Sequence, residues 1–397
     1  FSDGLSEELL NRLAQNNQLR VAARTSSFQF KGQNQDIADI GRQLKVDHIL
    51  EGSVRKAANR LRITAQLVQV GSGYHLWSET YDRSLEDIFS VQDEIASKIT
   101  AALLPRIVGE EPAARTAAYT PPPEAYQGYL LARNHFNKMT TVGVEKAYEI
   151  LQKLVREHPQ YGEAQALYAR VAYANSRRTG GDIPWIVAEQ QVRNALQLAS
   201  AADPDIPEIY LVEGLLHERS RDQGKAIEFY ERAIELNPSY AEAYRHLSEA
   251  AMGTGQDERA WEALAMAQKL DPIAVSTLSW VVRQADINGK PEMADEAMRM
   301  LGMVAPETAD DMQLHRLEDD NRPAEAAIAL EDFRANWPDA DPHDPMLSRL
   351  YAMLGKVDEA SELHAGIRAT LAAQRGDREL AISIMEEEAA NRPDPHD

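Results

Sequence analysis

The chain has 397 residues, of which 44% are hydrophobic and 26% charged, a composition typical of a water-soluble protein with two or three domains. It contains no cysteine, which excludes disulfides, thiolate metal sites and cysteine nucleophiles. The net charge is −21, and residues 1–105 hold 12 Lys+Arg against 13 Asp+Glu, so the remainder carries 30 against 50. Such acidity disfavours phosphate backbones, and no apolar run approaches the roughly 20 residues of a membrane span, so we expect neither nucleic acid nor membrane as a partner.

The first hundred residues predict a small α+β domain. Apolar residues at helical spacing predict helices, and alternation predicts strands. In chain order the expected elements are a helix over 3–17, a short strand over 20–23, a helix over 35–44, strands over 48–55, 61–67 and 74–81, and a helix over 85–104. Turns at 56–60 and 71–73 join the last three strands into an antiparallel meander.

Three stretches of this region carry a resemblance to a known family. They are Phe1 to Leu9 (FSDGLSEEL), Leu50 to Arg55 (LEGSVR) and His75 to Arg83 (HLWSETYDR). The region resembles the TolB N-terminal-like/FlgO-like domain over residues 1–104. In that family a further strand precedes the first stretch, so the resemblance implies that one strand is missing here and that the sheet has an unfilled edge.

Residues 105–123 predict a linker, because Pro105, Pro112 and Pro121 to Pro123 favour an extended spacer. The chain begins with Phe1 and has no signal-peptide pattern, so we expect it to be part of a longer protein.

A pattern with a period of 34 residues follows the linker. Pro238, Pro272 and Pro306 are spaced 34 apart. Twelve residues before each proline is an alanine, eight before it is a large residue, and five before it is a small or apolar one; these are Ala226, Tyr230 and Ala233, then Ala260, Leu264 and Ala267, then Ala294, Met298 and Leu301. This period predicts stacked helix pairs, since neither helix of a pair can bury its apolar stripe alone.

The repeated stretch resembles a tetratricopeptide (TPR) array, which we expect over residues 124–397 with degenerate units after Pro306. The predicted fold class is therefore mainly α, an α-α superhelix with a small N-terminal α+β domain. In TPR units the first helix lines a concave surface, and matching its slots predicts a peptide groove. The matching residues are Leu211, Leu215, Arg219, Arg245, Glu249, Met252, Arg283 and Asp286. The three arginines of this set are candidates to bind an acidic or C-terminal carboxylate group, or to pair with neighbouring carboxylates.

No catalytic pattern is found among the scattered histidines and glycines: no His-Glu-x-x-His, nucleophile elbow or phosphate loop occurs. We therefore expect a non-enzyme with no cofactor and no metal, which binds a protein or peptide in the concave face and senses a signal. Two alternatives stay open, a small-ligand sensor that regulates an upstream cyclase or DNA-binding domain, and an oligomerisation scaffold, for example a homodimer.

The combination of the two resemblances implies a context. Proteins with this pair of regions are often the distal part of CadC-type winged-helix transcriptional regulators or of adenylate cyclase-associated TPR proteins in bacteria. The compartment stays undecided between periplasm and cytoplasm, with a preference for the periplasmic part of an inner-membrane protein.

Overall fold

The computed structural model describes residues 2–337 except 15, 17, 18, 34, 59, 85, 86, 89, 93, 96, 97, 99–118, 178–184 and 321. The chain divides into two compact units, Phe1–Thr277 and Leu278–Asp397. Most of the predicted linker and all of the predicted repeats beyond residue 337 lie outside the described residues.

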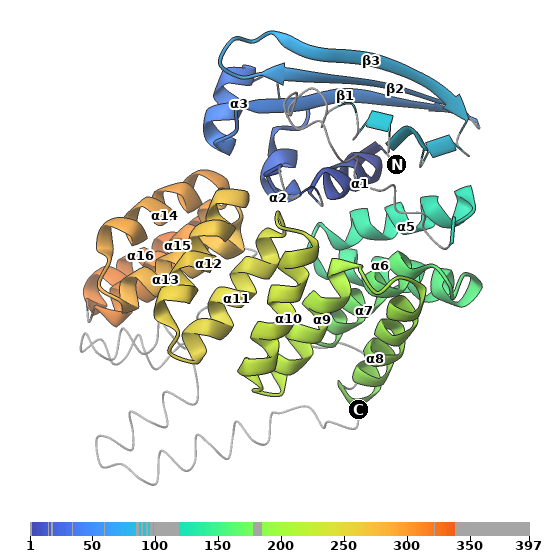
Figure 1. Ribbon diagram of the computed structural model, residues 1–397. Coiled ribbons are helices and arrows are strands. Elements are labelled where there is room, and N and C mark those ends of the chain that lie inside the picture. The colour runs from blue at the N-terminus through green and yellow to red at the C-terminus, as the bar shows by residue number, and fades with distance from the viewer. Residues whose placement is uncertain are drawn as a thin grey trace. The chain divides into compact units, whose positions relative to one another are not determined.

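The first unit begins with short helices and a three-stranded sheet (Figure 1). The elements are α1 (Ser2–Ala14), α2 (Arg24–Ser27), the 3-10 helix η1 (Phe28–Phe30), α3 (Ile37–Leu44), β1 (His48–Ala57), β2 (Arg60–Gln69) and β3 (His75–Ser84). The predicted helices over 3–17 and 35–44 and the three strands of the meander are confirmed. Helix α3 begins where the Asp36 carboxylate accepts a hydrogen bond from the Ala38 N–H at 2.7 Å, which satisfies a backbone donor of the first turn.

The sheet is antiparallel with strand order β1-β2-β3. Strand β2 buries every second residue (Leu61, Ile63, Ala65, Leu67), as its period-2 pattern predicts. The first turn is tighter than the predicted 56–60, because Ala57 already pairs with Arg60 and Ala58 adopts φ 50°. The described residues between 88 and 98 are helical where the sequence predicts the helix over 85–104.

The predicted strand over 20–23 is wrong. This stretch forms no ladder with the sheet. Instead the Val21 N–H donates to the Ser239 hydroxyl at 3.2 Å, and the Ala23 N–H donates to the Leu270 carbonyl at 2.7 Å. The backbone of this segment is therefore bound by the helical part of the chain.

Pairs of helices follow, as the 34-residue period predicts. The first unit contains α5 (Pro123–Phe136) with α6 (Thr141–Glu157), α7 (Gly162–Ser176) with α8 (Trp185–Ala202), α9 (Pro207–Arg219) with α10 (Gln223–Leu236), and α11 (Ala241–Gly253) with α12 (Asp257–Leu270). Helix α13 (Val275–Ile287) starts at the end of this unit, and the second unit continues with α14 (Pro291–Val304), α15 (Pro306–Asp319) and α16 (Pro323–Asn336). In the first unit, first helices of successive pairs also touch, α5 with α7 and α7 with α9.

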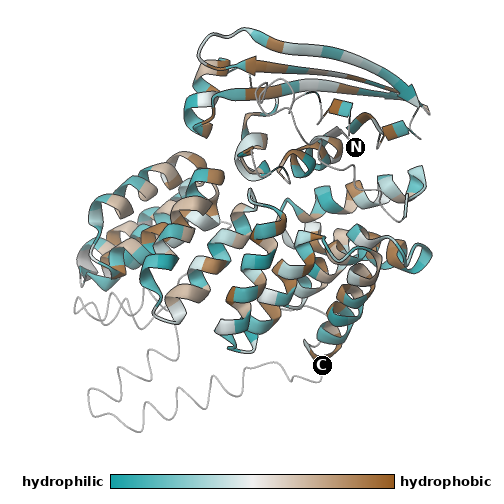
Figure 2. Cartoon of the chain, viewed as in Figure 1, coloured by the Kyte–Doolittle hydropathy of each residue, from teal (hydrophilic) through white to brown (hydrophobic). Residues whose placement is uncertain are grey.

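The repeated small residues explain this close packing. Ala226, Ala233, Ala260, Ala267 and Ala294 are all completely buried, so the helices meet over their Cβ atoms. Every helix of the array carries hydrophilic residues as well as hydrophobic ones (Figure 2), as expected of helices that bury one stripe and expose the other. The predicted fold class, a mainly helical solenoid with a small N-terminal α+β domain, is confirmed.

The compact unit Phe1–Thr277 joins the small domain to the first part of the array. The domain boundaries near residues 104 and 124 therefore stay a prediction. Among the described residues, no helix combines the length and the hydropathy that a membrane span requires.

Replacing Gly214 with alanine should destabilise the chain although it raises helix propensity. A Cβ at Gly214 on α9 would lie 2.3 Å from Cε1 of Tyr230, which is completely buried, so overpacking should cost about 1–3 kcal/mol. Gly302 on α14 is the matched control. Its Cβ would meet nothing within 4 Å, and alanine there should stabilise by up to about 1 kcal/mol. Urea denaturation followed by circular dichroism measures both changes. Equal effects of the two substitutions would contradict this packing.

Candidate functional site

A row of charged side chains links the first helices of four successive pairs. We call these five residues the charged row: Arg133 on α5, Arg170 on α7, Glu208 on α9, and Glu242 and His246 on α11. Glu208 accepts from Arg170 at 2.7 Å and lies 3.4 Å from Nη2 of Arg133. Arg170 also pairs with Glu242, whose Oε1 lies 3.9 Å from Nε2 of His246. Along its contacts the row therefore alternates in sign, from Arg133 to Glu208, Arg170 and Glu242, although α5 and α7 contribute the cations and α9 and α11 the carboxylates.

A carboxylate of helix α1, on Glu7, pairs with Arg133 at one end of the charged row. The Glu7 side chain is 9% exposed, and its Oε1 lies 3.4 Å from Nη1 of Arg133. Its Oε2 accepts from Asn137 at 2.8 Å and lies 3.0 Å from Nε of Arg24. A carboxylate this deeply buried is tolerated because cationic and amide donors surround it. The small domain is thus joined to the array by charge.

The second contact between the small domain and the array centres on Asp271, in the turn after α12. The Ser26 hydroxyl donates to Asp271 Oδ1 and accepts from the Ile273 N–H at 3.2 Å. Asp271 is 6% exposed. Burial raises the pKa of Asp271 to about 6, although hydrogen bonds from Ser26 and Thr25 lower it. We call the backbone contacts of Val21 and Ala23, together with this hydrogen-bonded group, the N-terminal clamp.

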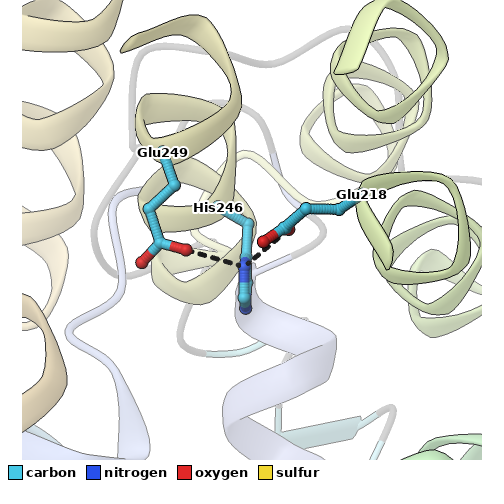
Figure 3. Close-up of side chains that lie close together, drawn as sticks. All are labelled: Glu218, His246 and Glu249. Carbon is cyan, nitrogen blue, oxygen red and sulfur yellow. Dashed lines mark ion pairs between the residues drawn. The ribbon is translucent and has the colours of Figure 1, made fainter. Parts of the chain in front are cut away.

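The charged row ends in a cluster of three side chains that point toward one another (Figure 3). Nδ1 of His246 lies 3.5 Å from Oε2 of Glu218 on α9 and 3.4 Å from Oε2 of Glu249 on α11. His246 is 8% exposed, and its Nδ1 is buried without a hydrogen-bond partner. Tyr230 donates its hydroxyl to Glu218 Oε2 at 2.6 Å and stacks on the imidazole with ring centroids 5.4 Å apart.

The charges of this cluster shift its pKa values. Burial and the neighbouring Arg245 lower the pKa of His246, but Glu218 and Glu249 outweigh them, so the pKa is raised. Burial raises the pKa values of Glu218 and Glu249, yet His246 lowers both below the ordinary value. Arg245 Nη2 lies 2.6 Å from Nε2 of His246. A guanidinium only donates, so in this geometry Nε2 accepts and the ring proton is on Nδ1.

The structure divides the predicted groove residues into buried and exposed ones. Leu211 and Leu215 are 0% and 6% exposed, so both pack in the helical core and neither offers a surface to a peptide. Met252 is half-buried against the same core. The slot pattern misplaces these leucines because α9 is wedged between neighbouring helices and is apolar on most of its circumference.

The charged groove residues have different surroundings. Arg245 is bonded to Glu249, which leaves neither side chain free in the described structure. Arg219 is exposed and stacks on Trp185, with its guanidinium carbon 4.0 Å from the ring centroid.

The second unit contains two residues of the predicted groove, Asp286 and Arg283. Asp286 lies 3.0 Å from Nε of Arg316. Arg283 is exposed.

The predicted set of site residues did not include His246, Tyr230 or Glu7, although Tyr230 was recognised as a residue of the repeat pattern. A signal for His246 does exist, since His246 and Glu249 stand three apart and so share a face of α11. Their proximity to Glu218 depends on how α9 and α11 pack, which spacing within one helix cannot give.

Comparison of the sequence with known proteins identifies a relative that is similar over part of the chain. No protein-family model matches the chain. The protein described as "Putative adenylate cyclase 3" of Rhizobium meliloti (strain 1021) is 38% identical over 172 residues, which cover 43% of this chain and 29% of the relative. The chain therefore spans less than a third of the length of that relative.

Several solved structures have partial similarity. The crystal structure of MamA gives a TM-score of 0.32 at 18% identity, covering 44% of this chain and 96% of that one. PilW, a type IV pilus biogenesis factor, gives 0.43 at 13% identity, covering 57% and 98%. Pseudomonas aeruginosa pilF gives 0.36 at 14% identity, covering 58% and 92%. Similarity of this extent transfers no function.

Proposed function

We propose that this chain is a non-catalytic module that binds a protein or peptide partner and transmits a signal within a bacterial signalling protein. The observation that carries this proposal is the N-terminal clamp. Ser239, in the turn before α11, and Leu270, the last residue of α12, hold an extended segment by its main chain at Val21 and Ala23. Main-chain hydrogen bonds are a general means of holding extended peptides, and helical repeats provide long surfaces for them. The array thus already binds one segment in cis.

Exposed arginines favour an acidic partner segment. Arg219 is exposed, and its guanidinium carbon lies over the Trp185 ring at 4.0 Å from the centroid, a cation–π contact that restricts the guanidinium. Arg283 is exposed on α13. Planar guanidinium groups bind carboxylates through paired hydrogen bonds, so Arg219 in the first unit and Arg283 in the second are each proposed, separately, as a contact for an acidic group.

The signalling context comes from the relative and from the N-terminal resemblance. A relative named as an adenylate cyclase favours a cyclase over a winged-helix DNA-binding domain as the output. The TolB N-terminal-like resemblance of residues 1–104 fits a sensing role for the small domain. We therefore propose that the module regulates a nucleotide-cyclase domain, and that joining of the small domain to the array through Glu7 and Arg133 couples partner binding to that output.

Charge reversal of Arg219 and Arg283 together should weaken binding of the partner at least about tenfold, because each charge-assisted hydrogen bond contributes about 1.5–3 kcal/mol. The partner is first isolated by affinity capture from a bacterial lysate and then titrated against purified variants by isothermal calorimetry. Arg193→Glu is the matched control, since Arg193 is an exposed arginine that pairs with Glu189 on its own helix. Equal affinity of the double variant and the wild type would remove these arginines from the binding surface. Failure of the wild type to retain any specific protein would contradict the proposed function.

A further inference from the structure

We propose that Glu218, His246 and Glu249 bind a divalent transition-metal cation, with Zn²⁺ the best chemical match. This proposal is independent of the protein-binding function. The three residues each offer one ligand atom, and these atoms all lie within 4.8 Å of one another. Figure 3 shows that both carboxylates point toward the same imidazole nitrogen, one from α9 and one from the helix that carries His246.

The distances in the cluster fit a metal better than hydrogen bonds. Charge-assisted hydrogen bonds between nitrogen and carboxylate oxygen are about 2.7–2.9 Å long. Here Nδ1 of His246 stands 3.5 Å from Glu218 Oε2 and 3.4 Å from Glu249 Oε2. Zinc bonds of about 2.0–2.2 Å at tetrahedral angles separate neighbouring ligand atoms by about 3.3–3.6 Å. The two N···O separations match those of ligands around one small cation, and the separation between the two carboxylate oxygens is at most 4.8 Å.

The buried nitrogen is a second, independent indication. Nδ1 of His246 has no hydrogen-bond partner although the residue is 8% exposed. A buried polar atom without a partner costs free energy, so such an atom requires an explanation. A cation between the two carboxylates would satisfy it. An imidazole ligand and a small ligand number also favour Zn²⁺ over Ca²⁺ and Mg²⁺, which prefer six or more oxygens.

Neighbouring side chains orient the carboxylates as an outer shell does in metal sites. Arg245 binds Oε1 of Glu249 and leaves Oε2 toward His246. Tyr230 donates to Oε2 of Glu218 at 2.6 Å, which fixes that carboxylate while a second lone pair of the oxygen faces the cluster.

Metal binding requires a change of tautomer at His246. In the structure Nε2 accepts from Arg245, so the ring proton is on Nδ1. The metal takes the Nδ1 lone pair, so the proton leaves Nδ1 and one binds Nε2, with no net change in the ring charge. Arg245 must then move off Nε2, and Glu242 Oε1, which lies 3.9 Å from Nε2, must come closer before it can accept from the new N–H. A histidine that donates to a carboxylate while its other nitrogen binds metal is the usual arrangement in zinc sites.

The test uses the full chain, stripped of metal and titrated with Zn²⁺. We expect one Zn²⁺ per chain after desalting, measured by elemental analysis, and a melting temperature that rises with Zn²⁺ concentration by mass action. Glu218→Gln keeps the size of the side chain and its acceptor for Tyr230, and should weaken Zn²⁺ binding at least tenfold. His217→Gln is the matched control, since His217 lies on the same helix but pairs with Asp222 outside the cluster. Its Zn²⁺ affinity should equal that of the wild type.

A second, more conservative variant separates loss of the metal ligand from loss of folding. Glu249→Asp keeps the charge but withdraws the ligand by one methylene, and circular dichroism verifies that each variant is folded before titration. Co²⁺ added to the wild type in place of Zn²⁺ should give the intense visible absorption of four-coordinate cobalt. The proposal is overturned if the wild type holds no stoichiometric Zn²⁺, or if folded Glu218→Gln and Glu249→Asp bind it as tightly as the wild type. The latter result would assign the binding to other histidines, and the former would leave the cluster as ion pairs only.

Discussion

Arg133→Met should destabilise the chain by about 3–5 kcal/mol. The Arg133 side chain is 13% exposed and lies within 3.8 Å of three carboxylates, on Glu7, Glu8 and Glu208. It also donates to the Tyr129 hydroxyl and stands over that ring at 5.0 Å. Methionine fills similar space but removes the cation that these three carboxylates share; Arg24 still faces Glu7 and Arg170 still faces Glu208. Breaking a buried ion pair from one side carries this cost.

Urea denaturation followed by circular dichroism measures this loss. Arg193→Met is the matched control: Arg193 is 52% exposed and pairs with Glu189 one turn away, so its loss should cost no more than about 0.5 kcal/mol. If both substitutions cost the same, the charged row contributes no more to stability than a surface ion pair. Hydrogen exchange should also rise in α1 of the Arg133 variant, because Glu7 and Glu8 on α1 each lose one ion pair to the array.

Asp271→Asn should stabilise the chain at neutral pH by about 3 kcal/mol and leave it unchanged near pH 4. The pKa of Asp271 is raised to about 6 when folded, against an ordinary value of 3.8. Between those values the folded chain holds a proton that the unfolded chain has lost, so the free energy of unfolding falls as pH rises. Each unit of difference contributes about 1.4 kcal/mol. Asparagine has no carboxyl to ionise and keeps the oxygen that accepts from Ser26.

The measurement is the difference in the free energy of unfolding between variant and wild type from pH 4 to pH 7. The difference should grow from near zero and level off above pH 6. Burial and the negative charge of Glu242 raise the pKa of Asp271, whereas hydrogen bonds from Ser26 and Thr25 lower it. The titration therefore measures the net effect of these groups on the pKa of Asp271. A difference that does not vary with pH would show that the carboxyl titrates alike in the folded and unfolded chain. Hydrogen exchange over residues 21–27 should follow the same pH course in the wild type only.

The repeat geometry was predictable because its causes are local. Pro238, Pro272 and Pro306 each follow the end of a second helix, and the small residues between them lie at the sites of closest approach. Where two helices must touch, the residue at the contact must be small, so small residues recur in the sequence at a fixed spacing.

Residues 20–23 were not predictable in the same way. Their composition suits a strand, and their extended backbone agrees with it. The partners, however, are Ser239 and Leu270, more than 200 residues away in the chain, and no local pattern identifies a backbone partner at that distance.

The cluster of Glu218, His246 and Glu249 was not predicted from the sequence. Slot matching was directed at a peptide groove, and of its residues Glu249 and Arg245 lie in the cluster whereas Leu211 and Leu215 are buried. Matching slots assumes that every first helix shows the same face to solvent, and α9 is too enclosed for that. His246 was missed because a buried histidine between carboxylates is recognisable only once two helices are packed together.

The N-terminal clamp determines the order in which parts of the chain can fold during synthesis. Ser26 leaves the ribosome 245 residues before Asp271. At about 5–20 residues per second, that interval lasts about 12–50 s, whereas helices form in microseconds once their residues are available. Helix pairs can therefore assemble one after another while residues 21–26 still have no site to bind. A segment that is made before the array is thus fixed only after α12 is made, and the nascent chain exposes it until then.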